Sequence, residues 1–166
     1  MRKIILFFCC TIALSLSAQH NKKGSNKSKT ILFRSLDITI NDLQYNLSSK
    51  DSVYTRNYEG DVKPKKIRII LTQKEKELIY KKALEVGFYS MPYYLEDNGI
   101  SISGTYPTEL SLVVDKKRKS VTHPGCCVKD EKMEKKFYEF LSFILIIIES
   151  RKEVQALPPS DVVLLL

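Results

Sequence analysis

The sequence has no tryptophan, and only two histidines, six glycines and six prolines occur among its 166 residues. Six scattered glycines cannot compose the glycine-rich loop of a dinucleotide or phosphate site, and two histidines without helical spacing cannot form a paired-histidine zinc helix. His20 lies in a polar N-terminal stretch, so a histidine general base would have to be His123. These absences exclude the enzyme classes that carry visible motifs and favour a non-catalytic protein.

The first 18 residues have the three parts of a secretory signal peptide. Arg2 and Lys3 are basic, Ile4 to Leu16 are mostly apolar, and Ser17-Ala18 are small residues suited to cleavage. The apolar stretch is shorter than the roughly 20 residues that a membrane span needs. We therefore expect export to the periplasm or the outside, with cleavage after Ala18 and no membrane span in the mature chain.

Cleavage there would leave 148 of the 166 residues and two of the four cysteines, Cys126 and Cys127. One adjacent pair cannot form a disulfide framework, so the mature chain must be held together by apolar burial. Residues 19–30 contain four lysines and no large apolar side chain, which predicts a flexible tether. The remaining residues, 31–166, are expected to form a single domain.

The net charge of +8 comes from lysines scattered over the whole chain. The densest basic cluster, Lys116–Lys119, lies between two alternating apolar runs, so we interpret it as an exposed hairpin turn rather than an anion-binding patch. Nucleic acid is not an expected partner of an exported chain. A protein or a polysaccharide partner stays open.

Alternation of apolar and polar residues with period two predicts strands. The runs are Leu36–Ile40, Tyr45–Leu47, Val53–Tyr58, Lys66–Leu71, Leu110–Val114 and Ser120–His123, and the stretch Gly99–Ser103 favours a further short strand. The apolar tail Val162–Leu166 is a candidate for an added edge strand.

Two segments switch to helical spacing. Thr72 and Glu75 match a capping box and Gly87 is placed to end the first helix, while Asp130 is suited to cap a second helix that runs to about Ser150. The first apolar stripe comprises Leu78, Ile79, Ala83, Leu84 and Val86, and the second comprises Met133, Phe137, Phe140, Leu141, Ile144 and Ile148. Eight of the nine residues 140–148 are apolar, which favours core burial over a dimer face.

This order of elements predicts one α+β domain, an antiparallel sheet of about five to seven strands with two helices packed on one face. The chain also resembles exported bacterial domains of unknown function of the Bacteroidetes type. The resemblance covers residues 35–160 and is carried by the meander, the helix that ends in Gly-Phe-Tyr, and the stretch Leu110–Cys127. It implies the same order of elements and assigns no functional residue.

A loop between the two halves of the sheet carries the best candidate ligand site. Tyr93 and Tyr94 stand beside Glu96 and Asp97, and aromatic faces with carboxylates suit an uncharged, hydroxyl-rich ligand such as a sugar. The alternative interpretation is a turn whose tyrosine rings cover the core.

His123, Cys126 and Cys127 are the only constellation with intrinsic chemistry. Adjacent cysteines can form only a strained, easily reduced disulfide, because their Cα atoms lie about 3.8 Å apart. Thiolates with an imidazole also suit a soft metal, although closed zinc sites space their cysteines wider. The third interpretation is a structural turn in which one thiol is buried and its neighbour faces the loop.

We therefore expect a non-catalytic exported binding or interaction module without a cofactor. The alternative is a soft-metal or redox function at Cys126 and Cys127 with His123. A hydrolase would have to use His123 with a nucleophile that only the fold brings close.

The mature N-terminus is expected at Gln19. Intact-mass measurement on protein recovered from its native host should show a chain shortened by 18 residues, because the signal peptide is removed on export. Recovery of the full-length chain from the cytoplasm would contradict this.

Overall fold

The computed structural model of the protein describes residues 33–100, 102 and 104–162. The predicted signal peptide at 1–18 and the predicted tether at 19–30 lie outside the described residues. Of the apolar tail, only Val162 is described, and it lies outside any strand.

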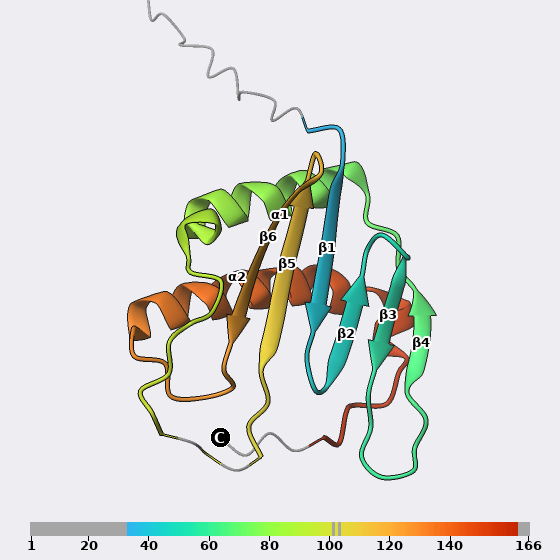
Figure 1. The fold of residues 1–166 in the computed structure, drawn as a ribbon. Helices are drawn as coiled ribbons and strands as arrows, with labels where there is room; N and C mark the ends of the chain where they lie inside the picture. Colours follow the sequence, from blue (N-terminus) through green and yellow to red (C-terminus); the bar gives the residue numbers. More distant parts are fainter. Residues whose placement is uncertain (1–32, 101, 103, 163–166) are drawn as a thin grey trace, which may run out of the picture. The chain divides into compact units, whose positions relative to one another are not determined.

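Six strands form one antiparallel sheet in the order β4-β3-β2-β1-β5-β6 (Figure 1). The first three strands form the predicted meander, β4 extends it and ends at Arg68 rather than at the predicted Leu71, and β5 pairs with β1 over the full length of β1. The strands are β1 (Leu36–Asn41), β2 (Tyr45–Ser48), β3 (Val53–Arg56), β4 (Lys65–Arg68), β5 (Thr108–Val114) and β6 (Lys117–His123).

The helices α1 (Gln73–Val86) and α2 (Glu131–Glu149) both lie on one face of this sheet (Figure 1). Leu36, Ile38 and Ile40 alternate along β1 with more exposed residues, and all three are buried in the core. Alternate side chains of a strand point to opposite faces, so the apolar set faces the helices. The predicted α+β fold is confirmed.

The hairpin between β5 and β6 differs from the predicted one. The structure turns at Asp115 and Lys116, which both have positive φ angles of 46° and 70°. A two-residue loop of this kind matches the twist of the strands, so β6 begins at Lys117 and pairs it with Val114. The prediction of a basic turn at 116–119 was wrong for three of its four residues, which belong to the strand.

The helix α1 has the predicted capping box. The Thr72 hydroxyl accepts the Glu75 N–H, and the Glu75 carboxylate accepts the Thr72 N–H at 2.7 Å. At the other end Gly87 adopts the left-handed conformation with φ of 73°. The buried residues are Ile79, Ala83 and Val86, whereas Leu78 and Leu84 of the predicted stripe are exposed, because they lie on the flanks of that face.

The helix α2 begins after Asp130, whose carboxylate accepts the Met133 N–H at 3.0 Å. Its buried side chains recur three or four residues apart, as predicted, and are Phe137, Phe140, Leu141, Ile144 and Ile148. Met133 is partly buried, and Ile146 is the strongly exposed member of the apolar run 140–148. Two short helices follow the longer ones, a 3₁₀ turn at Phe88–Ser90 after α1 and α3 (Lys152–Gln155) after α2.

No helix among the described residues is both long and apolar enough to cross a membrane.

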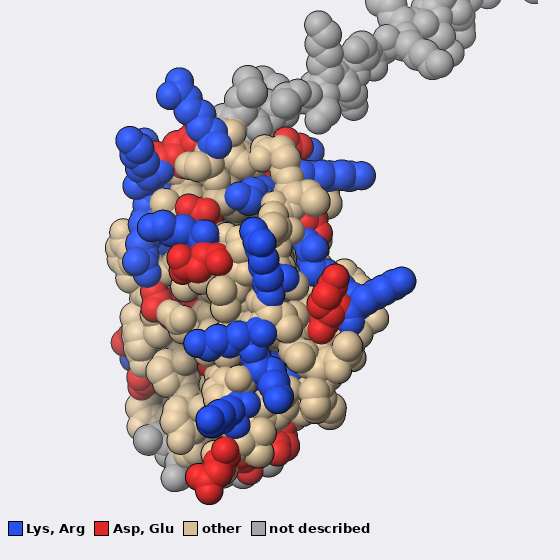
Figure 2. All heavy atoms as spheres, turned by 90° about the vertical axis from the view of Figure 1, so that its right-hand side faces the viewer, with Lys and Arg blue, Asp and Glu red and all other residues tan. Residues whose placement is uncertain are grey.

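One edge of the sheet is protected by charge. Lys65, Lys66 and Arg68 make up three of the four residues of β4 and are exposed, which opposes pairing with another chain. Figure 2 views the molecule from the right-hand side of Figure 1 and shows Lys and Arg side chains spread over this side, with Asp and Glu between them. This mixture is typical of a solvated surface.

Replacing Leu141 with alanine should lower the free energy of unfolding by about 2–5 kcal/mol, because a side chain that is 4% exposed leaves a cavity. Ile146→Ala on the same helix is the control, and its side chain is 69% exposed. For this control, urea denaturation should show that the free energy of unfolding falls by less than about 0.5 kcal/mol. Equal losses for the two variants would contradict the orientation of α2.

Candidate functional site

The free edge of β6 is partly covered by an extended segment, residues 93–98. The Leu95 N–H donates to the Thr122 carbonyl at 2.9 Å, and the Thr122 N–H donates to the Tyr93 carbonyl at 2.8 Å. Two further bonds connect the segment to the loop that follows β6, from Asn98 N–H to the Cys127 carbonyl and from Lys129 N–H to the Glu96 carbonyl. These bonds use only the backbone, so they fix the path of the segment whatever its side chains are.

This path sends neighbouring side chains to different places. Leu95 is buried in the core, whereas Tyr93 is exposed and has the Lys119 ammonium 4.3 Å from its ring centroid. The Glu96 carboxylate forms an ion pair with Lys129. Tyr93 and Glu96, two of the four predicted ligand residues, are therefore engaged with lysines on the surface.

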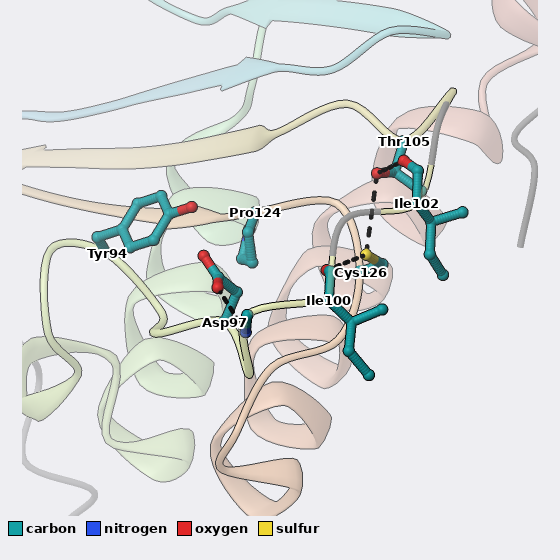
Figure 3. A pocket seen from close by; sticks show the side chains of 8 residues that line it. Tyr94, Asp97, Ile100, Ile102, Thr105, Pro124 and Cys126 are labelled. Atoms are coloured by element: carbon teal, nitrogen blue, oxygen red, sulfur yellow. Dashed lines mark hydrogen bonds between the residues drawn. The ribbon is translucent and has the colours of Figure 1, made fainter.

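Tyr94 and Asp97, the other two, line a pocket of about 270 Å³ (Figure 3). Its lining comes from described residues of the stretch that begins at Tyr94 and from the loop after β6, and Figure 3 shows the Asp97 carboxylate directed into the space between the Tyr94 hydroxyl and Pro124. Its full lining is Tyr94, Asp97, Gly99, Ile100, Ile102, Thr105, Pro124 and Cys126. Two of the predicted ligand residues thus share a pocket with Cys126, one residue of the predicted thiol cluster.

Three apolar side chains of this lining are exposed to solvent. Tyr94 is 50% exposed, Ile100 58% and Ile102 39%. The sequence predicted a short strand across Gly99–Ser103, but Ile100 and Ile102 lie outside any strand, so that prediction was wrong for both. Two isoleucines in a stretch of glycine and serine could have indicated a pocket wall. Because they alternate with polar residues, the sequence pattern indicates a strand instead.

Side-chain turns hold the acidic side of the pocket. The Asp97 Oδ1 accepts the Gly99 N–H at 2.9 Å, and the Asn98 Oδ1 accepts the Ile100 N–H at 3.0 Å. Asn and Asp commonly fold a chain back in this way. The Asp97 carboxylate is therefore oriented before any ligand arrives.

The loop after β6 requires a glycine. Gly125 has a φ of 105°, and a Cβ atom there would lie 2.7 Å from the Tyr106 carbonyl oxygen. Cys127 also has a positive φ, 61°, which is uncommon for a residue with a side chain.

Both cysteines are free and half-buried. The prediction that one thiol is buried while its neighbour faces the loop was wrong, since neither belongs to the core. The reason is the left-handed backbone of Cys127, which breaks the alternation that would direct neighbouring side chains apart.

The two adjacent thiols instead influence one another's protonation. Interaction with the Cys127 thiol lowers the pKa of Cys126, and the same interaction, together with burial, raises the pKa of Cys127 to about 11. The Cys126 Sγ also lies 3.8 Å from the Ile100 carbonyl oxygen and 3.9 Å from the Thr105 Oγ1, so it contacts the pocket wall.

His123 is fully buried and points into the core. Its Nδ1 accepts the Gly125 N–H at 3.0 Å, and the Tyr138 hydroxyl lies 3.4 Å from the same nitrogen. Nδ1 is therefore the acceptor of the neutral ring, and Nε2 donates its proton to the Glu134 carboxylate at 2.9 Å. For His123 to act as the general base of a hydrolase, the nucleophile would have to replace the Gly125 N–H as the donor to Nδ1.

The structure does not bring His123, Cys126 and Cys127 together as ligands. Within the described part of the chain, no three side chains of His, Cys, Asp or Glu form a group that could hold a metal ion. The soft-metal hypothesis stays a prediction.

A second cavity, of about 170 Å³, lies between the β1–β2 turn and α2 and has Tyr45 and Tyr138 in its wall. Burial raises the pKa of both tyrosines, that of Tyr138 to about 12. The Asp42 carboxylate of this cavity accepts the Gln44 N–H and the Thr108 hydroxyl, the latter at 2.6 Å. Its carboxylate is thus engaged in bonds that hold the fold.

No protein-family model matches the chain, and no curated protein is similar to it. The predicted resemblance to exported bacterial domains stays a prediction, and the function rests on the pocket beside Tyr94.

Proposed function

We propose that the protein is an exported, non-catalytic binding module that holds a small hydroxyl-rich molecule, of mono- or disaccharide size, in the pocket beside Tyr94 and Asp97. The observation that carries this proposal is the gathering of three solvent-exposed apolar side chains, Tyr94, Ile100 and Ile102, around one oriented carboxylate. Exposed apolar side chains that converge on a hollow are typical of ligand sites.

The chemistry of the lining favours a saccharide. A sugar ring offers an apolar C–H face and a rim of hydroxyl donors, which match an aromatic or aliphatic wall and a carboxylate acceptor respectively. The volume of about 270 Å³ lies just below the range of roughly 300–1,000 Å³ that is usual for small-molecule sites. This favours one or two sugar rings over a long chain.

Among the described residues, the pocket lining contains one carboxylate, that of Asp97, and no buried base. Glycoside hydrolysis needs two carboxyl groups about 5 Å or more apart across the substrate. His123 does not line the pocket, and both of its ring nitrogens have partners in the fold. The lining therefore supports binding rather than turnover.

Titration of the protein with glucose, N-acetylglucosamine, maltose and cellobiose at millimolar concentrations, followed by NMR of backbone amides, should shift the signals of Asp97, Gly99 and Cys126. Tyr94→Ala should weaken the binding of the best sugar about tenfold or more, because the stacking face is lost. Asp97→Asn keeps the acceptor for the Gly99 N–H and should weaken binding through the lost charge alone.

The matched controls are Tyr93→Ala and Glu96→Gln, which alter neighbouring residues of the same segment that do not line the pocket. We expect both controls to bind the sugar with an affinity within about twofold of that of the unchanged protein, whereas Tyr94→Ala should weaken it about tenfold. Absence of binding for all four sugars, or equal losses for Tyr93→Ala and Tyr94→Ala, would overturn the proposal.

A further inference from the structure

The wall of the proposed ligand pocket contains the Cys126 thiol, Cys127 follows it directly in the chain, and sugar binding makes no use of either thiol. Cys126 and Cys127 are both free, both half-buried and adjacent in the chain. A structural cysteine of this kind is usually buried in the core, and neither of these is. The exposure of both thiols in one loop is therefore unexplained by packing.

The backbone of this loop is held in an uncommon shape. Gly125 and Cys127 have left-handed φ angles of 105° and 61°, with Cys126 between them. The Cys127 carbonyl accepts the Asn98 N–H at 2.8 Å, and Val128 pairs with Asp97. A side-chain-bearing residue stays in this conformation only where its surroundings fix it, and such positions cluster at functional sites.

We propose that Cys126 and Cys127 are a redox site that forms a reversible disulfide between the two adjacent residues, with a low-molecular-weight disulfide as the oxidant. The Cys126 thiolate attacks one sulfur of that disulfide and releases the first small thiolate. The Cys127 thiolate then attacks the Cys126 sulfur of the mixed disulfide and releases the second. The two electrons and the two thiol protons end on two molecules of small thiol, so the exchange balances.

The contacts around the pair assign the order of attack. Interaction with the neighbouring Cys127 side chain lowers the pKa of Cys126 and so favours its thiolate, which is the attacking species. The carboxylates of Glu134 and Asp97 add to the raised pKa of Cys127. Cys126 also faces the open pocket, where a small disulfide can reach it.

Disulfide formation would alter the pocket, and this step rests on the proposed function. In the dithiol form the Cys126 Sγ contacts the Ile100 carbonyl and the Thr105 hydroxyl, at 3.8 and 3.9 Å. A bond of about 2 Å to the Cys127 sulfur would move the Cys126 sulfur away from the Ile100 carbonyl and the Thr105 hydroxyl, which it now contacts only at long range. The wall formed by Ile100, Ile102 and Thr105 then loses these two contacts with the Cys126 sulfur, while the backbone bond from Asn98 to Cys127 is kept.

The test treats the reduced full-length protein with oxidised glutathione, blocks the remaining thiols with iodoacetamide, and digests the protein with trypsin. The peptide Ser120–Lys129 contains Cys126 and Cys127 and no other cysteine, so Cys9 and Cys10 do not interfere. We expect this peptide unalkylated and lighter by two hydrogens, and dithiothreitol should restore two alkylatable thiols. A lasting glutathione adduct or a cross-link between two chains would overturn the proposal.

Cys127→Ser is the matched variant, because it keeps the attacking thiol and removes the resolving one. Its peptide should carry one glutathione on Cys126 and form no ring. If the adduct fails to form on Cys126 in this variant, the assigned order of attack is wrong.

The effect on the pocket has its own readout, amide NMR of the reduced and the oxidised protein. Signals of Gly99, Ile100 and Thr105 should shift on oxidation, and a sugar that binds the reduced protein should change in affinity about fivefold or more. Ring formation without shifts at these residues would contradict the coupling. If no sugar binds in either state, the proposed function fails, while the peptide mass and the amide shifts still decide the redox site.

Discussion

Everything described around the pocket depends on the backbone pairing of residues 93–98 with β6 and with the loop that follows it. Four hydrogen bonds connect Tyr93, Leu95, Glu96 and Asn98 to partners between Thr122 and Lys129. They cover part of the free edge of the sheet, bury Leu95 in the core and carry Tyr94 and Asp97 to the same side as Cys126. Without this pairing, the tyrosines and the cysteines would belong to two unrelated loops.

A second constraint holds the loop that carries Cys126 and Cys127 against the core. His123 ends β6 as a fully buried side chain that is held on one ring nitrogen by Glu134 of α2 and on the other by the Gly125 N–H. A buried imidazole without such partners would be costly, so this histidine serves the packing of α2 on the sheet. The same bond to Gly125 fixes where the turn before Cys126 begins. The only histidine that could have suggested catalysis therefore positions the loop that carries the thiols.

The sequence predicted the features that rest on local pattern. The alternation of Leu36, Ile38 and Ile40 and the capping box of Thr72 describe interactions within a few residues, and both predictions are confirmed. The pairing of residues 93–98 leaves no such pattern, because it uses backbone groups that every residue has and partners about 30 positions away. The left-handed backbone conformation of Cys127 could likewise not be predicted from the sequence, because a cysteine at this position gives no indication of a positive φ. The four predicted ligand residues lie within five positions of one another, and their residue types do not reveal that Tyr94 and Asp97 line the pocket while Tyr93 and Glu96 contact lysines.

The segment 93–98 is fixed to β6 by backbone hydrogen bonds, and this places Tyr94 and Asp97 in the wall of the pocket. Native-state hydrogen exchange, followed by NMR at the amides of Leu95, Asn98, Thr122 and Lys129, tests it most directly. Because each amide donates to a backbone carbonyl, exchange should be slower than in an unstructured chain by about a hundredfold or more at all four positions. Exchange at the rate of an unstructured chain at these amides, with the amides of β5 still protected, would contradict the account.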